Sequence, residues 1–241
     1  MRPTLLTVHG LRVPSYPAML YLGVALGIVA QNVAANAAGI PADRVWIATL
    51  LLLPLALVGA RLLHVAGHWD DYRHDLPRIV DRATGGMAMY GGLIVMLPAS
   101  LVVLALLDLP YWRFWDVTIF LILLAMVCTR VGCLLNGCCA GRPTEGRFGV
   151  ELRDVHGIAT RRVPTQLLEA ALAAALLCVA VAAWSVVDRP GELFLVVAAG
   201  YGVGRTLLQP LRNARARIDG MLLLSVAIVV LAVAGLVLVR A

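Results

Sequence analysis

Seven long apolar stretches, separated by short polar segments, follow one another along the chain. Each stretch is long enough to cross a hydrocarbon core of roughly 30 Å as a helix. Backbone groups that face lipid must find hydrogen-bond partners within their own segment, so an apolar stretch of this length crosses the membrane as a helix. The pattern predicts an all-α integral membrane protein with seven transmembrane helices, at residues 17–38, 45–67, 87–107, 117–136, 166–186, 191–209 and 219–239.

The composition agrees with this class of protein. Hydrophobic residues make up 61% of the 241 residues, charged residues 14%, and the mean hydropathy is +0.88. These values lie outside the range of soluble domains, and we predict a single polytopic membrane domain over residues 1–241. The net charge of +6 comes from arginines scattered through short loops, which excludes nucleic acid as a partner because they form no binding face. Removal of the first stretch as a signal peptide, with cleavage near Ala35–Ala37, stays an alternative.

Two segments between the predicted helices have a distinct character. The extramembrane loop at residues 140–165 contains an alternating stretch, Phe148 to Arg153, which predicts a small hairpin between the fourth and fifth helices. Amphipathic aromatic rings favour the membrane interface. We therefore interpret four aromatic residues before the fourth helix as an interfacial belt: Tyr111, Trp112, Phe114 and Trp115.

Two arginines, Arg130 and Arg205, stand well inside apolar stretches. A guanidinium group at the centre of a bilayer costs roughly 2.5 to 3.5 kcal/mol on insertion scales, so such a residue faces a polar pocket and a partner anion. Arg61 lies in the second apolar stretch, 45–67, and Glu169 is the one carboxylate that we expect inside the helices. The arginines therefore exceed the acids, and a phospholipid head group is the natural missing anion.

The neighbours of these arginines lie at helical spacing. Arg130, Cys133 and Gly137 share one helix face, with Asn136 beside it. A second set of residues follows at offsets of four, four and three, which places them on one stripe of a helix: Tyr201, Arg205, Gln209 and Arg212. This stripe either faces a ligand or is a row of side chains that snorkel toward the interface, and snorkelling suits Arg212 best because it lies near the end of the helix.

Glycine pairs flank a tyrosine at the start of the third predicted helix. Gly85 and Gly86 precede Tyr90, and Gly91 and Gly92 follow it. Paired glycines let a ligand or a neighbouring helix approach closely, and a helix-packing seam explains the glycines as well as a ligand does. The seam does not explain the tyrosine between them.

The five cysteines are Cys128, Cys133, Cys138, Cys139 and Cys178. Their spacing matches no zinc pattern of the Cys-x-x-Cys kind, so we predict no metal site. Cys133, Cys138 and Cys139 are compatible with a disulfide in an oxidising compartment or with a thiol nucleophile, and the sequence does not choose between them.

Taken in order, these motifs resemble the bacterial prolipoprotein diacylglyceryl transferases over nearly the whole chain. The residues that carry the resemblance are Pro14-Ser-Tyr16, Gly59-Ala-Arg61, Trp69-Asp-Asp-Tyr72 with Pro77, Gly85 to Ile94, Arg130-Val-Gly132, Asn136-Gly137, Gly141, Pro164-Thr-Gln-Leu167 with Glu169, and Tyr201 to Arg212.

The resemblance implies a seven-helix enzyme of the bacterial inner membrane that works without a cofactor. Its substrates would be phosphatidylglycerol and the lipobox cysteine of a prolipoprotein, onto whose thiol the diacylglyceryl group is transferred with release of glycerol phosphate. Arg130 and Arg205 would hold the phosphate and stabilise its charge, with Tyr90 as a third catalytic residue. The substrate-binding residues would be Tyr16, Arg61, Gly91, Gly92, Asn136, Gly137, Gly141, Gln166, Glu169, Tyr201 and Arg212.

The chain departs from this family's pattern at four positions. Tyr90 stands where many members have histidine, and a tyrosine of ordinary pKa near 10 is a poor base at neutral pH. Cys133, Cys138 and Gln209 stand where the family has an asparagine and two glutamates. Two alternatives follow: a divergent relative that transfers a lipid part to another acceptor, and a membrane protein that binds or moves phospholipid without catalysis.

The orientation in the membrane is predicted differently by charge and by resemblance. Most loop arginines lie at the amino terminus and after the second, fourth and sixth helices, which the positive-inside rule places in the cytoplasm. The resemblance implies the opposite orientation. We expect the resemblance to hold, because arginines at the mouth of an anion site serve binding and distort the statistical rule.

Overall fold

The computed structural model describes residues 4–8, 11–80, 88–153, 158–212 and 220–240. The chain divides into a larger unit, Met1–Ala34 with Trp115–Ala241, and a smaller unit, Ala35–Phe114. The single domain over residues 1–241 stays a prediction. Gly85 and Gly86 lie outside the described residues.

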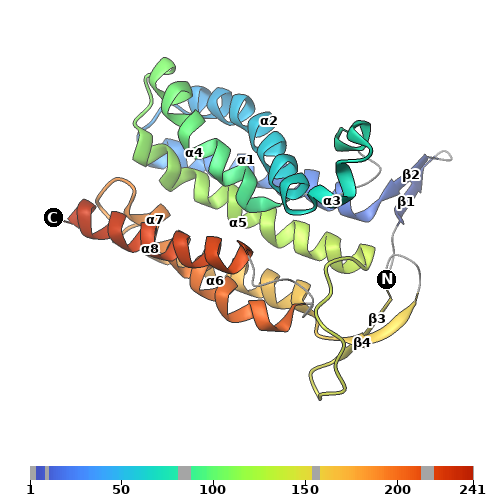
Figure 1. The fold of residues 1–241 in the computed structure, drawn as a ribbon. Helices are drawn as coiled ribbons and strands as arrows, with labels where there is room; N and C mark the ends of the chain where they lie inside the picture. Colours follow the sequence, from blue (N-terminus) through green and yellow to red (C-terminus); the bar gives the residue numbers. More distant parts are fainter. Residues whose placement is uncertain (1–3, 9–10, 81–87, 154–157, 213–219, 241) are drawn as a thin grey trace. The chain divides into compact units, whose positions relative to one another are not determined.

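The larger unit consists mainly of helices. Figure 1 shows α6, α7 and α8 running side by side. Its elements are β1 (Thr4–Val8), β2 (Leu11–Pro14), most of α1 (Ser15–Ala37), most of α5 (Tyr111–Asn136), β3 (Val150–Arg153), β4 (Ala159–Arg162), α6 (Thr165–Ala183), α7 (Glu192–Leu208), the 3-10 helix η2 (Gln209–Leu211) and α8 (Gly220–Arg240).

Glycines set the distance between the helices of the larger unit. A Cβ atom on Gly23 of α1 would lie 2.7 Å from the Cβ of Cys128 in α5, and one on Gly27 would lie 2.9 Å from the Leu121 backbone. On α7, a Cβ on Gly202 would lie 3.0 Å from the Ser225 carbonyl of α8. Membrane helices gain stability from such close van der Waals contact, because the hydrophobic effect does not drive their association within lipid.

Asp116 connects α5 to the start of α7. Its two carboxylate oxygens accept hydrogen bonds from the backbone N–H groups of Gly191, at 2.6 Å, and Phe194, at 2.9 Å. The first backbone N–H groups of a helix have no partner within the helix, and the helix dipole favours a negative charge there. Asp116 is thus a fixed cap for α7, a role that the sequence analysis missed.

The prediction of an interfacial belt is wrong for two of its four aromatic residues. Phe114 and Trp115 are fully buried. The Trp115 ring packs against that of Phe194 in the larger unit, with 5.1 Å between the ring centroids. The helix α5 begins six residues before the predicted start, because Pro110 accepts the N–H of Phe114 and opens its first turn. These rings therefore pack inside the protein.

The smaller unit is built on two helices in close contact. The N–H of Ala88, just before α4, donates a 2.9 Å hydrogen bond to the carbonyl of Ala60 in α2. A Cβ on Gly91 would lie 2.9 Å from the carbonyl carbon of Gly59, and one on Gly92 would lie 3.0 Å from the Ala56 carbonyl oxygen. The helices and short segments of this unit are α2 (Ala42–Gly67), α3 (Trp69–Tyr72), η1 (Leu76–Ile79) and α4 (Met89–Leu106).

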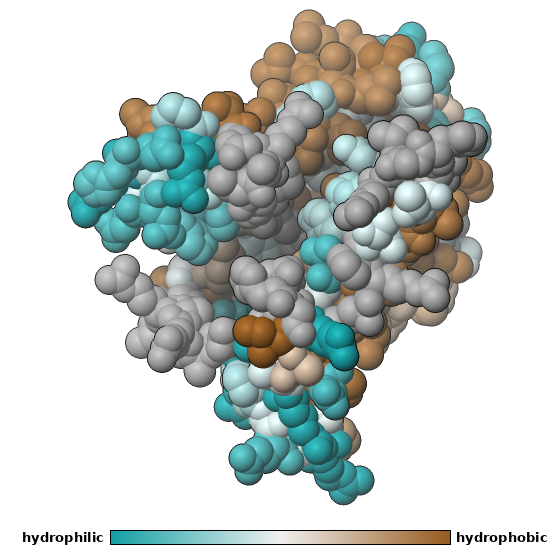
Figure 2. All heavy atoms as spheres, turned by 90° about the vertical axis from the view of Figure 1, so that its right-hand side faces the viewer, coloured by the Kyte–Doolittle hydropathy of each residue, from teal (hydrophilic) through white to brown (hydrophobic). Residues whose placement is uncertain are grey.

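A helix lies at each of the seven predicted positions. In the described part of the chain, five helices are long and apolar enough to cross a membrane: α1, α2, α5, α6 and α8. Large apolar side chains such as Leu106, Leu231 and Leu238 are exposed, and apolar and polar side chains gather in separate areas of the face shown in Figure 2. Apolar exposure on this scale marks contact with lipid. The protein is a multi-pass membrane protein with an all-helical membrane part.

The loop between α5 and α6 carries the predicted hairpin. Strands β3 and β4 pair antiparallel, with Val150 opposite Arg162 and Arg153 opposite Ala159. A bridge between Pro143 and Arg162 continues the pairing toward the end of α5. The hairpin thus reaches the segment that contains Gly141.

Candidate functional site

Glu169 lies at the centre of a group of three arginines in the larger unit. Its carboxylate is 1% exposed, and its Oε2 atom lies 2.6 Å from the Nε of Arg130. Its Oε1 atom accepts a hydrogen bond from Arg212 and lies 3.8 Å from Nη1 of Arg205. We call Arg130, Arg205 and Arg212 around Glu169 the arginine cluster.

Three separate segments supply the arginine cluster. Arg130 comes from the last turns of α5, Glu169 from the first turns of α6, and Arg205 from the last turn of α7, with Arg212 just beyond η2. Arg205 also donates a 2.8 Å hydrogen bond from Nη1 to Oε1 of Gln209. Two members of the predicted stripe, Arg205 and Arg212, therefore lie at Glu169, and Arg212 pairs with this buried carboxylate instead of snorkelling.

Among the residues that the structure describes, the arginine cluster carries two positive charges in excess, because three guanidinium groups share one carboxylate. The side chains of Arg130, Arg205 and Arg212 are only 18%, 9% and 26% exposed. Charges withdrawn from water in this way need compensation. A guanidinium group binds phosphate or carboxylate oxygens with two parallel hydrogen bonds, so an oxyanion is the ligand that suits this group of residues.

Gly141 joins the three segments beside the arginine cluster. Its N–H donates to the carbonyl of Val163 at 2.9 Å, and the next N–H, of Arg142, donates to the carbonyl of Leu211 at 3.0 Å. A Cβ atom at Gly141 would lie 2.7 Å from Cγ2 of Thr165 and 2.8 Å from the Val163 carbonyl oxygen. Only glycine fits where the α5–α6 loop, the start of α6 and η2 meet.

The end of α5 has a Schellman motif. The N–H of Cys138 donates to the carbonyl of Cys133 and the N–H of Gly137 to that of Leu134, at 3.1 and 3.3 Å. Gly137 has a φ of 80°, the left-handed conformation that this motif requires. Gly137 thus ends the helix immediately after Asn136 and turns the chain toward α6.

The first turn of α6 holds Cys138 and Cys139, the two residues that follow Gly137. Gln166 donates a 2.8 Å hydrogen bond from Nε2 to the carbonyl of Cys138, and the Thr165 hydroxyl donates one of 2.9 Å to that of Cys139. Both side chains are buried. Gln166, a predicted substrate-binding residue, therefore has a structural contact through its amide nitrogen.

Three thiols gather in this segment. The sulfur atoms of Cys133, Cys138 and Cys139 all lie within 4.8 Å of one another. Hydrogen bonds with the thiols of Cys133 and Cys138 lower the pKa of the Cys139 thiol, and the positive charges of Arg130 and Arg212 lower it further. The spacing of these cysteines leaves their role open and gives no sign of their grouping, because it follows no known metal pattern.

Tyr16 lies on α1, which packs against α5, and Tyr201 lies on α7, the helix that carries Arg205. A Cβ on Gly132 of α5 would lie 3.3 Å from the Cα of Tyr16, so the first turn of α1 packs against α5 two residues after Arg130. Tyr201 is buried on α7, one turn before Arg205. Their predicted contacts with substrate stay predictions.

The other predicted residues belong to the smaller unit. Arg61 donates 2.8 Å hydrogen bonds to the carbonyls of Ile79 and Arg78, and its guanidinium group lies 5.3 Å from the centre of the Tyr72 ring. Tyr90 is buried at the start of α4. The close packing of Gly91 and Gly92 on α2 agrees with the helix-packing seam, and their substrate contacts, like those of Arg61 and Tyr90, stay predictions.

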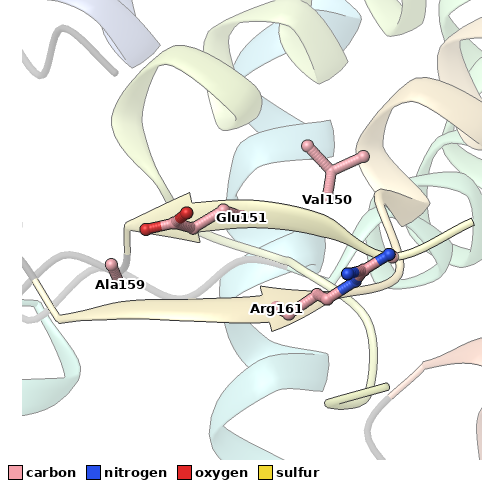
Figure 3. A pocket seen from close by; sticks show the side chains of 5 residues that line it. Val150, Glu151, Ala159 and Arg161 are labelled. Carbon is pink, nitrogen blue, oxygen red and sulfur yellow. The ribbon is translucent and has the colours of Figure 1, made fainter. Parts of the chain in front are cut away.

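A shallow pocket lies on the β3–β4 hairpin (Figure 3). It contains none of the predicted site residues, and its one basic side chain, Arg161, donates to the carbonyl of Gly146 at 3.2 Å. The lining residues are Gly149, Val150, Glu151, Ala159 and Arg161. The arginine cluster is thus chemically far better suited to an anionic ligand.

Comparisons with known proteins identify the family of this chain. A family model described as "Prolipoprotein diacylglyceryl transferase" matches residues 3–239. A phosphatidylglycerol–prolipoprotein diacylglyceryl transferase of Chloroflexus aggregans is 31% identical over 137 residues, which are 57% of this chain and 45% of that protein. A protein of the same name from Clostridium kluyveri is 30% identical over 137 residues, covering 57% of this chain and 54% of that protein.

Thus the chain spans about half the length of these two relatives. A third relative of the same name, from Bacillus cereus, is 27% identical over 234 residues, which are 89% of this chain and 86% of that protein. With a family match over nearly its whole length, the chain belongs to the prolipoprotein diacylglyceryl transferase family.

Proposed function

We propose that the protein transfers the diacylglyceryl group of phosphatidylglycerol to the lipobox cysteine thiol of a prolipoprotein, releasing glycerol phosphate. The observation that carries the proposal is the excess of two positive charges in the arginine cluster around Glu169. The names of the relatives support the two substrates.

The charge of the arginine cluster matches the charge that develops in this reaction. The substrate sulfur forms a bond to the glyceryl carbon, the bond from that carbon to the phosphate oxygen breaks, and the thiol proton leaves to a base. The phosphodiester carries one negative charge, whereas the departing phosphate monoester carries two once the pH exceeds about 6. An excess of two positive charges therefore stabilises the leaving group more than the substrate, as catalysis requires.

Each member of the arginine cluster has its own proposed role. Arg130 and Arg205 bind the phosphate oxygens, and Arg212 contributes the third positive charge. Glu169 reduces the repulsion among the three guanidinium groups and fixes the direction of the Arg130 side chain through the 2.6 Å contact. Tyr16, Asn136 and Tyr201 shape the lipid site, and the attacking sulfur comes from the substrate.

We also propose that all seven helices cross the bacterial inner membrane as a single domain. The 18 residues of α4 and the 17 of α7 correspond to about 27 and 26 Å at 1.5 Å per residue. These lengths approach the hydrocarbon thickness of roughly 30 Å, and local thinning of the bilayer accommodates the difference. In the orientation that the family resemblance implies, the amino terminus lies outside the cytoplasm.

Transfer is tested in bacteria depleted of their own diacylglyceryl transferase. The protein is expressed together with a test prolipoprotein, whose mass is then measured. We expect the mass to increase by one diacylglyceryl group, and no increase when the lipobox cysteine is replaced by serine. Good membrane expression without any mass increase would overturn the proposal, and retained phospholipid binding in that case would indicate a protein that binds lipid without catalysis.

A further inference from the structure

The thiols of Cys133, Cys138 and Cys139 form a group that the proposed transfer reaction does not use. Their sulfur atoms lie within 4.8 Å of one another. Three thiolates bound to one metal ion at about 2.3 Å have sulfur atoms about 4 Å apart. The observed separations therefore approach those of a three-sulfur metal site.

The backbone holds the three thiols in this arrangement. Cys139 has a φ of 62°, a left-handed conformation that costs a residue with a Cβ atom of order 1 kcal/mol or more. The Schellman motif at Gly137 brings Cys138 back over Cys133, and Thr165 and Gln166 bind the carbonyls of Cys139 and Cys138. Strain that the surrounding structure maintains in this way is typical of functional sites.

We propose that Cys133, Cys138 and Cys139 bind a soft, thiophilic metal ion, and that the ion is monovalent copper. Thiolates prefer soft ions. Zinc favours four ligands in structural sites, whereas in the described part of the chain this group offers three. Monovalent copper is stable with three sulfur ligands, so it fits the group without a fourth residue.

The surroundings provide both access and charge compensation. Cys139 is exposed, Cys138 is half-buried and Cys133 is buried, so an ion enters through Cys139 and passes inward. Binding of one copper(I) ion by three thiols releases three protons and leaves a net charge of two negative. Arg130 and Arg212 interact electrostatically with Cys139, so their positive charges offset part of the negative charge of this complex.

The test uses the purified full-length protein under anaerobic, reducing conditions. Copper(I) is titrated in competition with a chromophoric copper(I) chelator, and bound copper is measured by elemental analysis and X-ray absorption. We expect one copper ion per chain, surrounded by three sulfur atoms at about 2.3 Å. Cys139→Ser should weaken copper binding by roughly a hundredfold or more, since loss of a direct ligand costs at least as much as the 10- to 100-fold typical of an outer-shell partner.

The matched control is the double variant Cys128→Ser, Cys178→Ser, which keeps the three thiols and should bind copper like the unmodified protein. Cys133 is buried, so Cys138→Ser serves as the second ligand variant if Cys133→Ser does not fold. Equal copper affinity in the Cys139→Ser and control proteins would overturn the proposal. So would a stable disulfide among the three cysteines that persists under the reducing conditions and prevents copper uptake.

Discussion

The Nε atom of Arg130 lies 2.6 Å from Oε2 of Glu169, although the two residues belong to different helices of the larger unit. Glu169 also pairs with Arg205 and Arg212. One buried carboxylate thus sets the positions of three guanidinium groups. The phosphate-binding property proposed for the arginine cluster depends on this acid as much as on the arginines.

Replacing Glu169 with glutamine should destabilise the protein by about 3 to 5 kcal/mol, because buried guanidinium groups then lack their counter-ion. Thermal unfolding of the purified protein measures the loss. Inorganic phosphate at high concentration should restore part of the stability of Glu169→Gln, since a bound anion replaces the missing charge. Glu145→Gln, a change in the exposed α5–α6 loop, is the control and should leave the Tm unchanged. No effect of phosphate on the Tm of Glu169→Gln would contradict an anion-binding role.

Arg130→Lys and Arg205→Lys should each lower kcat/KM for diacylglyceryl transfer by a factor of roughly one hundred or more. Lysine keeps the charge but cannot form two parallel hydrogen bonds to a phosphate. The measurement is the rate of mass increase of a test prolipoprotein with phosphatidylglycerol vesicles. Arg147→Lys in the exposed loop is the control and should transfer at the normal rate. Near-normal rates with lysine at both positions would rule out the proposed phosphate contact.

Gly141→Ala should destabilise the larger unit by about 1 to 3 kcal/mol, the usual cost of forcing extra atoms into a packed site. The added methyl group would lie 2.7 Å from Cγ2 of Thr165 and would also press on the backbone at Val163. Thermal unfolding and transfer activity should fall together. Gly220→Ala, where no atom lies within 4 Å of the added Cβ, is the matched control, and equal Tm values for the two variants would contradict this prediction.

The helices and the candidate anion site differ in how far the sequence predicts them. Lipid leaves the backbone of an apolar stretch no alternative to a helix, and for this reason the ends of α6 and α7 fall within three residues of the predicted ends. Similarly, the apolar stretches contain so few acids that Glu169 stands out as their internal carboxylate, and the arginines of these stretches exceed it in number. That Arg205 and Arg212 share this acid with Arg130 depends on how α5, α6 and α7 pack, which no local pattern specifies.

The cysteine group and the aromatic residues show where local patterns mislead. Cys133, Cys138 and Cys139 converge because Gly137 and Cys139 both have positive φ angles, and the spacing of the cysteines gives no sign of that turn. Trp115 has the residue type and the position in the chain that are typical of an interfacial residue. Its burial against Phe194 depends on a helix that lies far along the chain.

Gly91→Ala distinguishes helix packing from substrate binding in the smaller unit. The added methyl carbon would lie 2.5 Å from the Cβ of Leu63 and 2.9 Å from the carbonyl carbon of Gly59. The Gly59 carbon belongs to the backbone and the Leu63 Cβ is attached to it, so neither atom can move aside easily. We therefore expect the Tm to fall by several degrees. Gly67→Ala, on α2 of the same unit and with no atom within 4 Å of the added Cβ, is the control for alanine in this unit. If Gly91→Ala lost transfer activity while its Tm stayed at the control value, Gly91 would be a substrate contact and the packing explanation would be wrong.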